Sequence, residues 1–221
     1  MKAIFIDEAL KQISNEVSLG CLNYTITVEK DSQKIWDHIN SKTIPAIIDE
    51  ITPDKLIYEK HIKDSREFYK KLGKDPSRYR ISSEALLKRI LQKKDLYTIN
   101  NVVDINNLIS MTSRYSVGSY DVSKLGEKLE FRKGNEGESY KGIGKEMINI
   151  SYLPVFADEF GAYGSPTSDS ERAMITLRSS EIMTVIISFS GTTDLEHWLL
   201  QAKKCFETFT NAHDFESKII V

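Results

Sequence analysis

One short polar segment constrains this chain more than any other. Residues 100–107 read Asn-Asn-Val-Val-Asp-Ile-Asn-Asn, so four asparagines and one aspartate surround a pair of valines. Buried amide and carboxylate groups are costly unless each one finds a hydrogen-bond partner. Such a segment is either a polar scaffold that pins a turn or the wall of a binding pocket. We interpret it as chiefly structural, with Asp104 fixing the turn and Asn107 as the one side chain that touches a ligand.

Hydrophobic periodicity predicts helices early and late in the chain, with strands between them. Helices are expected after Ser32, at 58–72, at 82–92 with Ser82 as N-cap, and after Thr193, where Thr193 and Glu196 would form a capping box. Strands are expected at 22–28, 129–132, 147–150, 154–157 and 182–189.

Two further patterns complete this outline of the fold. Pro45 and Pro53 are expected to break the early chain into short pieces, and the pattern after residue 98 is strand and turn. Early and late helices around a strand-rich middle define the α+β class. A length of 221 residues with 40% hydrophobic side chains suits a single domain over 1–221.

Positive charge is concentrated in one segment. Residues 60–94 carry twelve basic and four acidic side chains, a net charge of +8, whereas the whole chain has −2. Basic stripes of this kind bind phosphate backbones without reading sequence. A solvated helix face with i,i+4 pairs, such as Glu59 with Lys63 and Glu67 with Lys71, explains the charge about as well. The candidate RNA-binding residues are Lys63, Arg66, Lys70, Lys71, Lys74, Arg78 and Arg80.

Motifs of covalent and metal chemistry are absent from the sequence. The four histidines are scattered and neither cysteine has a metal-ligand spacing, so we expect no metal and no cofactor. Two cysteines are too few for a disulfide framework, which favours reduced thiols in the cytoplasm. No apolar run is long enough to cross a bilayer, so we expect no membrane partner. Asp121 and Asp158 are the acids of interest, although a turn cap explains Asp121 at least as well.

Several motifs occur in an order that one known family shares. They are Asn100–Asn107, Tyr120-Asp121, Phe131-Arg132 and Gly137-Glu138, and with them the chain resembles the B3/B4 domain of the phenylalanyl-tRNA synthetase β subunit. Two further segments, 73–89 and 164–169, resemble free-standing B3/B4 proteins more than the synthetase. The resemblance is strongest over 60–190. It implies a B3/B4-like layered β core with flanking helices.

The resemblance also implies a function. In the synthetase this module is an editing domain that hydrolyses a wrongly attached tyrosine from tRNA without a covalent nucleophile. The matching substrate pocket would be lined by Asn107, Gly118, Tyr120, Asp121 and Val185. Two positions depart from the family pattern, because Gly118 replaces a histidine and Val185 replaces a tyrosine-sensing glutamate. A valine side chain cannot accept a hydrogen bond from a tyrosine hydroxyl, so the resemblance implies recognition of another amino acid.

Three functions are compatible with these features. The first is a free-standing B3/B4-type protein that binds tRNA or aminoacyl-tRNA and acts in trans as a deacylase, a hydrolase. The second is a non-catalytic binding module for a small amino-acid-like ligand. The third is an interaction protein whose basic helix docks an acidic partner. Salt-sensitive tRNA binding favours the first, a thermal shift with a free amino acid favours the second, and failure of both assays leaves the third.

Overall fold

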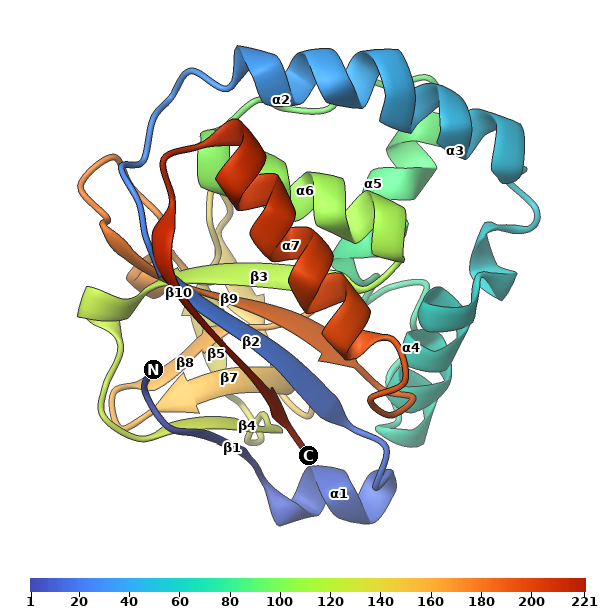
Figure 1. Ribbon diagram of the computed structural model, residues 1–221. Coiled ribbons are helices and arrows are strands. Elements are labelled where there is room, and N and C mark those ends of the chain that lie inside the picture. The colour runs from blue at the N-terminus through green and yellow to red at the C-terminus, as the bar shows by residue number, and fades with distance from the viewer.

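Two four-stranded sheets form the centre of the computed structural model, which describes residues 1–221 (Figure 1). The strands are β1 (Ile4–Ile6), β2 (Ser18–Thr25), β3 (Ser116–Asp121), β4 (Leu129–Lys133), β5 (Ser139–Lys141), β6 (Met147–Asn149), β7 (Pro154–Asp158), β8 (Gly161–Gly164), β9 (Glu181–Ser188) and β10 (His213–Ile220). One sheet has the order β1-β4-β7-β8 and the other β10-β2-β9-β3, while β5 and β6 form a separate hairpin. Only β1 and β4 pair in parallel.

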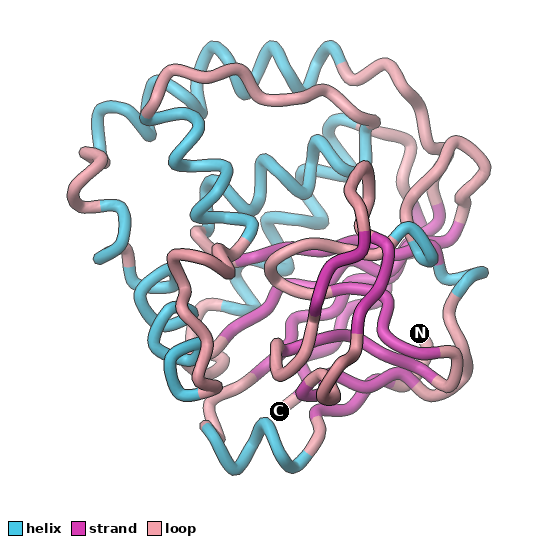
Figure 2. Tube along the Cα trace, turned by 180° about the vertical axis from the view of Figure 1, so that it is seen from behind, coloured by secondary structure: helices cyan, strands magenta, loops and turns pink.

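The helices lie mainly on one side of the second sheet, and the first sheet covers its other side (Figure 1). They are α1 (Glu8–Ile13), α2 (Gln33–His38), α3 (Ile44–Glu50), α4 (Lys60–Lys71), α5 (Ser82–Leu91), α6 (Asn101–Ser113) and α7 (Leu195–Phe209). A π-helical segment, Ile39–Thr43, joins α2 to α3 without a break. Figure 2 shows from behind that the helices gather away from the strands. The fold is therefore of the expected α+β class.

The central strands β2 and β9 are buried on both faces. Seven of the eight residues are buried in each strand. Helices α6 and α7 cover one face, while aromatic side chains of the first sheet cover the other. Strands covered on both sides do not alternate between apolar and polar residues as a half-buried strand does. For this reason β2 starts earlier and ends earlier than the expected 22–28.

The largest difference from the sequence expectation is α6. Residues 101–113 form a helix, not the expected strand and turn. Asn100 is its N-cap, because the side-chain Oδ1 accepts a hydrogen bond from the Val103 amide at 2.9 Å. Asn101 bonds the backbone of Thr27 and of Glu29. The asparagines thus serve a helix start and its neighbouring chain, which is where such residues compete best with ordinary helix formers.

Other helix boundaries differ in smaller ways. Pro45 lies inside the continuous helix of α2 and α3, directly after the π-helical segment, so it does not break the chain. Asp194 precedes α7 and no side chain caps that end, so the expected capping box is wrong. Ser82 is the first helical residue of α5 and Ile81 holds the N-cap position. Strands β1 and β10 had no clear sequence signal. No helix has both the length and the apolar character needed to span a membrane.

Candidate functional site

Three of the five predicted pocket residues come together between the two sheets. Gly118 on β3 lies directly opposite Val185 on β9. Tyr120 is two residues further along β3 and therefore points to the same face as Gly118. Its ring centroid lies 5.5 Å from that of Phe156 and 5.0 Å from that of Tyr163, both in the first sheet. This face of β3 and β9 is the inter-sheet face.

The hydroxyl group of Tyr120 fills the space beside Gly118. A Cβ atom added at Gly118 would lie 2.5 Å from the Tyr120 Oη, and one added at Gly164 would lie closer still. The phenol is 1% exposed and donates a hydrogen bond to Asp169 Oδ1 at 2.9 Å. Glycine at position 118 is therefore required by the tyrosine two residues later, since any side chain there would overlap the phenol.

The other two predicted pocket residues lie on the opposite side of the second sheet. Asn107 is half-buried on α6, next to Asn106, whose Oδ1 accepts a hydrogen bond from Ser119 at 2.9 Å. Ser119 alternates with Gly118 along β3, so α6 covers the other face. Asp121 shares the alternation of Ser119. The structure therefore does not bring Asn107 and Asp121 together with Gly118 and Val185.

Asp121 caps a turn. Its Oδ1 accepts hydrogen bonds from the Ser123 amide at 3.1 Å and the Ser123 hydroxyl at 2.6 Å, and its Oδ2 accepts one from Ser179 at 2.6 Å. Burial alone would raise the pKa of Asp121, but these hydrogen bonds lower it overall. The turn is the 3₁₀ helix Val122–Lys124. The interpretation of Asp121 as a cap is confirmed.

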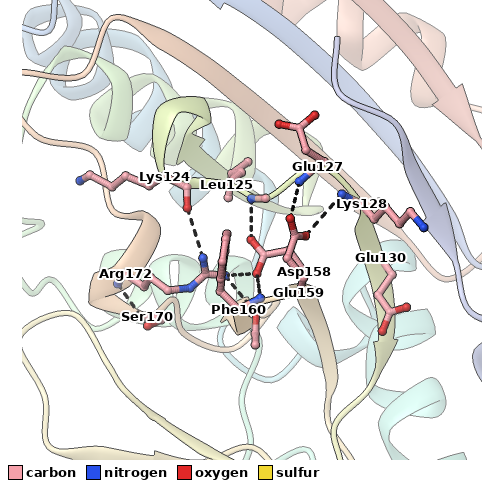
Figure 3. Close-up of polar contacts among 12 residues, drawn as sticks. Lys124, Leu125, Glu127, Lys128, Glu130, Asp158, Glu159, Phe160, Ser170 and Arg172 are labelled. Atoms are coloured by element: carbon pink, nitrogen blue, oxygen red, sulfur yellow. Dashed lines mark hydrogen bonds and ion pairs between the residues drawn. The ribbon is translucent and has the colours of Figure 1, made fainter.

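Asp158, the second acid of interest, ties three loops together (Figure 3). Its carboxylate accepts hydrogen bonds from the Gly126 amide and the Phe160 amide, both at 2.9 Å, and from the Arg172 guanidinium at 2.8 Å. Arg172 also donates to the carbonyl oxygens of Lys124 and Gly161. Every oxygen of this buried carboxylate is in use, so the role of Asp158 is to hold the edge of the first sheet.

Asp169 is the buried acid that the sequence analysis did not single out. It accepts hydrogen bonds from the Tyr120 hydroxyl and, at 3.2 Å, from the Ser165 amide. Burial raises the pKa of Asp169 to about 6. The sequence did hold one indication that Asp169 is important: it ends the 164–169 segment, one of the two segments that resemble free-standing B3/B4 proteins. What the sequence could not show was that this segment folds back over Tyr120.

The raised pKa of Asp169 predicts a pH dependence of stability. Between the unfolded value near 3.8 and about 6, the folded state holds a proton that the unfolded state has lost. Stability therefore falls as pH rises through this window and is constant with respect to this group above it. We expect Asp169→Asn to remove this part of the slope. Urea denaturation of both proteins from pH 4 to 7 measures it, and parallel pH profiles of the two proteins would contradict the prediction.

Two of the predicted RNA-binding arginines are paired with a buried carboxylate. Arg66 makes two 3.0 Å hydrogen bonds to the carboxylate of Glu84, which is 4% exposed. Arg80 bonds the same carboxylate at 3.3 Å. These contacts join α4 to α5. A guanidinium group that is hydrogen-bonded to a buried carboxylate has a structural role, and its positive charge is largely neutralised by that carboxylate.

The remaining basic residues of this surface are better placed for a partner. Lys63 is exposed and lies 3.9 Å from Glu67. The two expected pairs do not form, because Glu59 bonds Arg114 instead of Lys63, and Glu67 lies near Lys63 instead of Lys71. The following residues of the predicted set make no ion pair in the structure: Lys70, Lys71, Lys74 and Arg78.

An aromatic cluster extends the basic surface. The Nζ atom of Lys74 lies 5.0 Å from the ring centroid of Tyr79 and 5.2 Å from that of Tyr152. Lys133 Nζ lies 5.1 Å from the Tyr152 ring. Tyr152 has a positive φ of 62°, an uncommon backbone conformation for a tyrosine. Lys133 and Tyr152 escaped the sequence analysis because they are distant from the 60–94 segment along the chain.

Comparison with known proteins identifies the family. The B3/4 domain family model matches residues 64–197, more than half of the chain. The chain is also 36% identical to the phenylalanine–tRNA ligase β subunit of Wolbachia sp. subsp. Brugia malayi (strain TRS) over 73 residues, which is 33% of this chain and 9% of that protein. The matched part thus spans less than a tenth of that relative.

A solved structure is similar over nearly the whole chain. It is an N-terminal fragment of the phenylalanyl-tRNA synthetase β subunit from Pyrococcus horikoshii, with a TM-score of 0.47, 12% identity, and coverage of 99% of this chain and 50% of that one. The family match is the finding that decides: this chain belongs to the B3/4 domain family. It is a B3/4 protein related to the phenylalanyl-tRNA synthetase β subunit, as the resemblance implied.

Proposed function

We propose that this chain binds tRNA or aminoacyl-tRNA and acts in trans as a deacylase that hydrolyses a wrongly attached aminoacyl ester. The observation that carries the proposal is membership in the B3/4 family over 64–197, a range that includes both Gly118 and Val185. Direct pairing of these two residues on β3 and β9 supports a common site at that place. We further propose that residues 1–221 act as one B3/B4-like domain, since one apolar core of 52 residues runs through both sheets. We also propose that this domain works in the cytoplasm.

In this proposal the acyl group is received on the inter-sheet face that carries Gly118, Tyr120 and Val185. Because the Tyr120 phenol occupies the space there, substrate binding displaces it. On the other side of β3, Asn106 bonds Ser119 and Asp121 bonds Ser179, while Asn107 lies next to Asn106 on α6. The site works without a covalent nucleophile, and a water molecule attacks the ester.

The apolar wall of β9 sets the selectivity of the proposed site. Val185 and Ile187 lie on the same face as Gly118, and both are buried and offer no side-chain acceptor. A tyrosine hydroxyl placed against them would lose its hydrogen bonds to water without replacement, which disfavours it strongly. We therefore propose that the cleaved amino acid is not tyrosine.

The RNA contact is proposed on the exposed basic surface of α4 and the loop after it. Lys63, Lys70, Lys71, Lys74 and Arg78 supply free or nearly free positive charge, and Lys133 and Tyr152 extend it. Arg66 and Arg80 position this surface through Glu84. Phosphate contacts of this kind fix an RNA in place without reading its sequence.

The variant Lys70→Glu/Lys71→Glu/Lys74→Glu is expected to weaken tRNA binding broadly and to flatten its dependence on salt. The reason is that fewer counterions are released when three phosphate contacts are lost. Filter binding of bulk tRNA over a series of salt concentrations measures both quantities. The matched control reverses three other exposed lysines that make no ion pair, Lys128, Lys204 and Lys218, and should bind nearly as the parent does. Equal affinity of parent and triple variant at low salt would refute this placement.

A second function is favoured by the closed state of the inter-sheet face. The Tyr120 phenol and Asp169 occupy it, and no histidine stands at position 118. A non-catalytic module for a small amino-acid-like ligand needs only a pocket that opens there. A panel of free amino acids in a thermal-shift assay separates the two, since the module would be stabilised by one of them and would cleave no aminoacyl-tRNA.

A further inference from the structure

A groove of about 630 Å³ lies between the α2–α3 helix and the segment after α5. One wall carries Gln33, Trp36, Asn40, Ile44 and Ile48. Their spacing of three or four residues places them on one face of the continuous helix. Ile90 and residues 93–96 form much of the other wall. The volume lies within the range of sites for small molecules, and the groove is separate from the inter-sheet face.

Asp104 holds the two walls in place from beneath. Its Oδ2 accepts hydrogen bonds from the Ser32 hydroxyl at 2.5 Å and the Trp36 indole at 2.9 Å, both from the helical wall. Its Oδ1 accepts one from the Ile99 amide at 3.1 Å, at the end of the other wall. The groove is therefore built before any ligand arrives, which lowers the entropic cost of binding.

The helical wall contains an irregularity of the kind that often marks a functional position. Asn40 lies within the π-helical segment Ile39–Thr43. Short π-helical turns inside α-helices recur at functional sites. The Asn40 side chain is exposed, lines the groove and makes no hydrogen bond within the protein. It is free to donate to or accept from a ligand.

The groove combines cations with apolar surface. Lys30, Lys93 and Lys94 line it and make no ion pair, and with Asp31 and Asp95 the lining has a net charge of +1. The apolar part consists of Trp36, Ile44, Ile48, Ile90 and Leu96. Ile48 is 46% exposed, which is unusual for an isoleucine that serves only the core. Phosphates suit the lysines, and the flat faces of bases suit the apolar wall.

We infer that this groove binds an unpaired RNA strand, with phosphates on Lys93 and Lys94 and bases against Trp36, Ile44 and Ile48. Unpaired nucleotides expose the base faces that a duplex hides. The inference rests on the proposed tRNA binding and assigns an unpaired stretch of the tRNA to a site apart from the inter-sheet face, which receives the aminoacylated 3′ end. The helical wall lies before residue 64, where the family match starts, so this part of the site belongs to the region outside the match.

The two tryptophans of the chain make the groove directly observable. In the variant Trp198→Phe, Trp36 is the sole tryptophan and its fluorescence reports on the groove. Titration with the ribotrinucleotide UUU, a single strand unrelated to the aminoacylated 3′ end, is expected to change this fluorescence in a saturable way. Adding Lys93→Glu and Lys94→Glu should weaken the response about tenfold, because two phosphate contacts become repulsive. The control Lys203→Glu/Lys204→Glu makes the same change of charge on α7 and should leave it unaltered.

The test separates this inference from the proposed function. The variant Lys70→Glu/Lys71→Glu/Lys74→Glu, on the same single-tryptophan background, should keep the trinucleotide response while it loses affinity for whole tRNA. A parent chain that binds no whole tRNA but shows the response would overturn the proposed function and leave the groove as an RNA-strand site. The inference is overturned if UUU leaves the Trp36 fluorescence unchanged, if the Lys93→Glu/Lys94→Glu variant responds like the parent, or if a free amino acid alone gives the response.

Discussion

Replacing Asp104 with alanine is expected to lower the free energy of unfolding by about 3–5 kcal/mol, because two buried donors and one half-buried donor lose their only acceptor. These are the Ser32 hydroxyl, the Trp36 indole N–H and the Ile99 amide. Asp104 itself is fully buried, so water does not replace the lost oxygen atoms. Urea denaturation followed by circular dichroism measures the change.

Two variants control this result. Asp37→Ala removes an exposed carboxylate of α2 that accepts one hydrogen bond from Gln33, and should change stability by no more than about 0.5 kcal/mol. Asp104→Asn keeps one acceptor oxygen and should fall between parent and alanine. An Asp104→Ala protein with an unchanged melting temperature and no activity would show that the segment is catalytic, against our interpretation.

The second large effect concerns the space shared by Gly118 and Tyr120. Gly118→Ala is expected to destabilise the fold by about 2–3 kcal/mol, since the new methyl group overlaps the Tyr120 hydroxyl. Tyr120→Phe removes that hydroxyl and leaves Asp169 with the Ser165 amide as its remaining donor, at a cost of about 1–2 kcal/mol. In the double variant the overlap with the hydroxyl is relieved. The destabilisation of the double variant should therefore be about 1–2 kcal/mol smaller than the sum of the destabilisations of the two single variants.

A double-mutant cycle of unfolding free energies measures this coupling. Gly20→Ala is the matched control, because Gly20 lies on the other face of the same sheet, where an added Cβ meets Leu199 at 3.2 Å. Its cost should simply add to that of Tyr120→Phe. Additive costs for Gly118→Ala and Tyr120→Phe would mean that the phenol does not occupy the space beside position 118.

Much of the fold follows from local patterns in the sequence. The amphipathic helices α4, α5 and α7 and the strands β4, β6, β7 and β9 lie within a few residues of their expected positions. The helices have a 3.6-residue period, β4 alternates, and the other strands are rich in residues that favour strands; all of these are properties of the segment itself. The order of motifs also led to the B3/4 family, which the match over 64–197 shows.

What the sequence missed depends on contacts between distant segments. Residues 100–113 contain many poor helix formers, and α6 is stable because Ser32, Trp36 and Glu29 complete its polar groups. The charge count over 60–94 could not show that Arg66 and Arg80 turn inward to Glu84.

The predicted pocket residues include side chains from both faces of β3 for a similar reason. Spacing along β3 places Gly118 and Tyr120 on one side and Asp121 on the other, but the side on which α6 packs is set by tertiary structure. Asn107 was therefore grouped with residues that the sheet separates from it. The groove beside Trp36 was invisible in the sequence because its two walls are contributed by segments that are about fifty residues apart.

Incubation of the purified chain with a panel of aminoacyl-tRNAs, each carrying one labelled amino acid, tests the central claim most directly. The account predicts that at least one ester is hydrolysed well above its spontaneous rate, that tyrosyl esters are not, and that the Lys70→Glu/Lys71→Glu/Lys74→Glu variant loses most of this activity at physiological salt. Preferential cleavage of a tyrosyl ester, or a panel in which no ester is cleaved by a chain that also fails to bind tRNA at low salt, would contradict it.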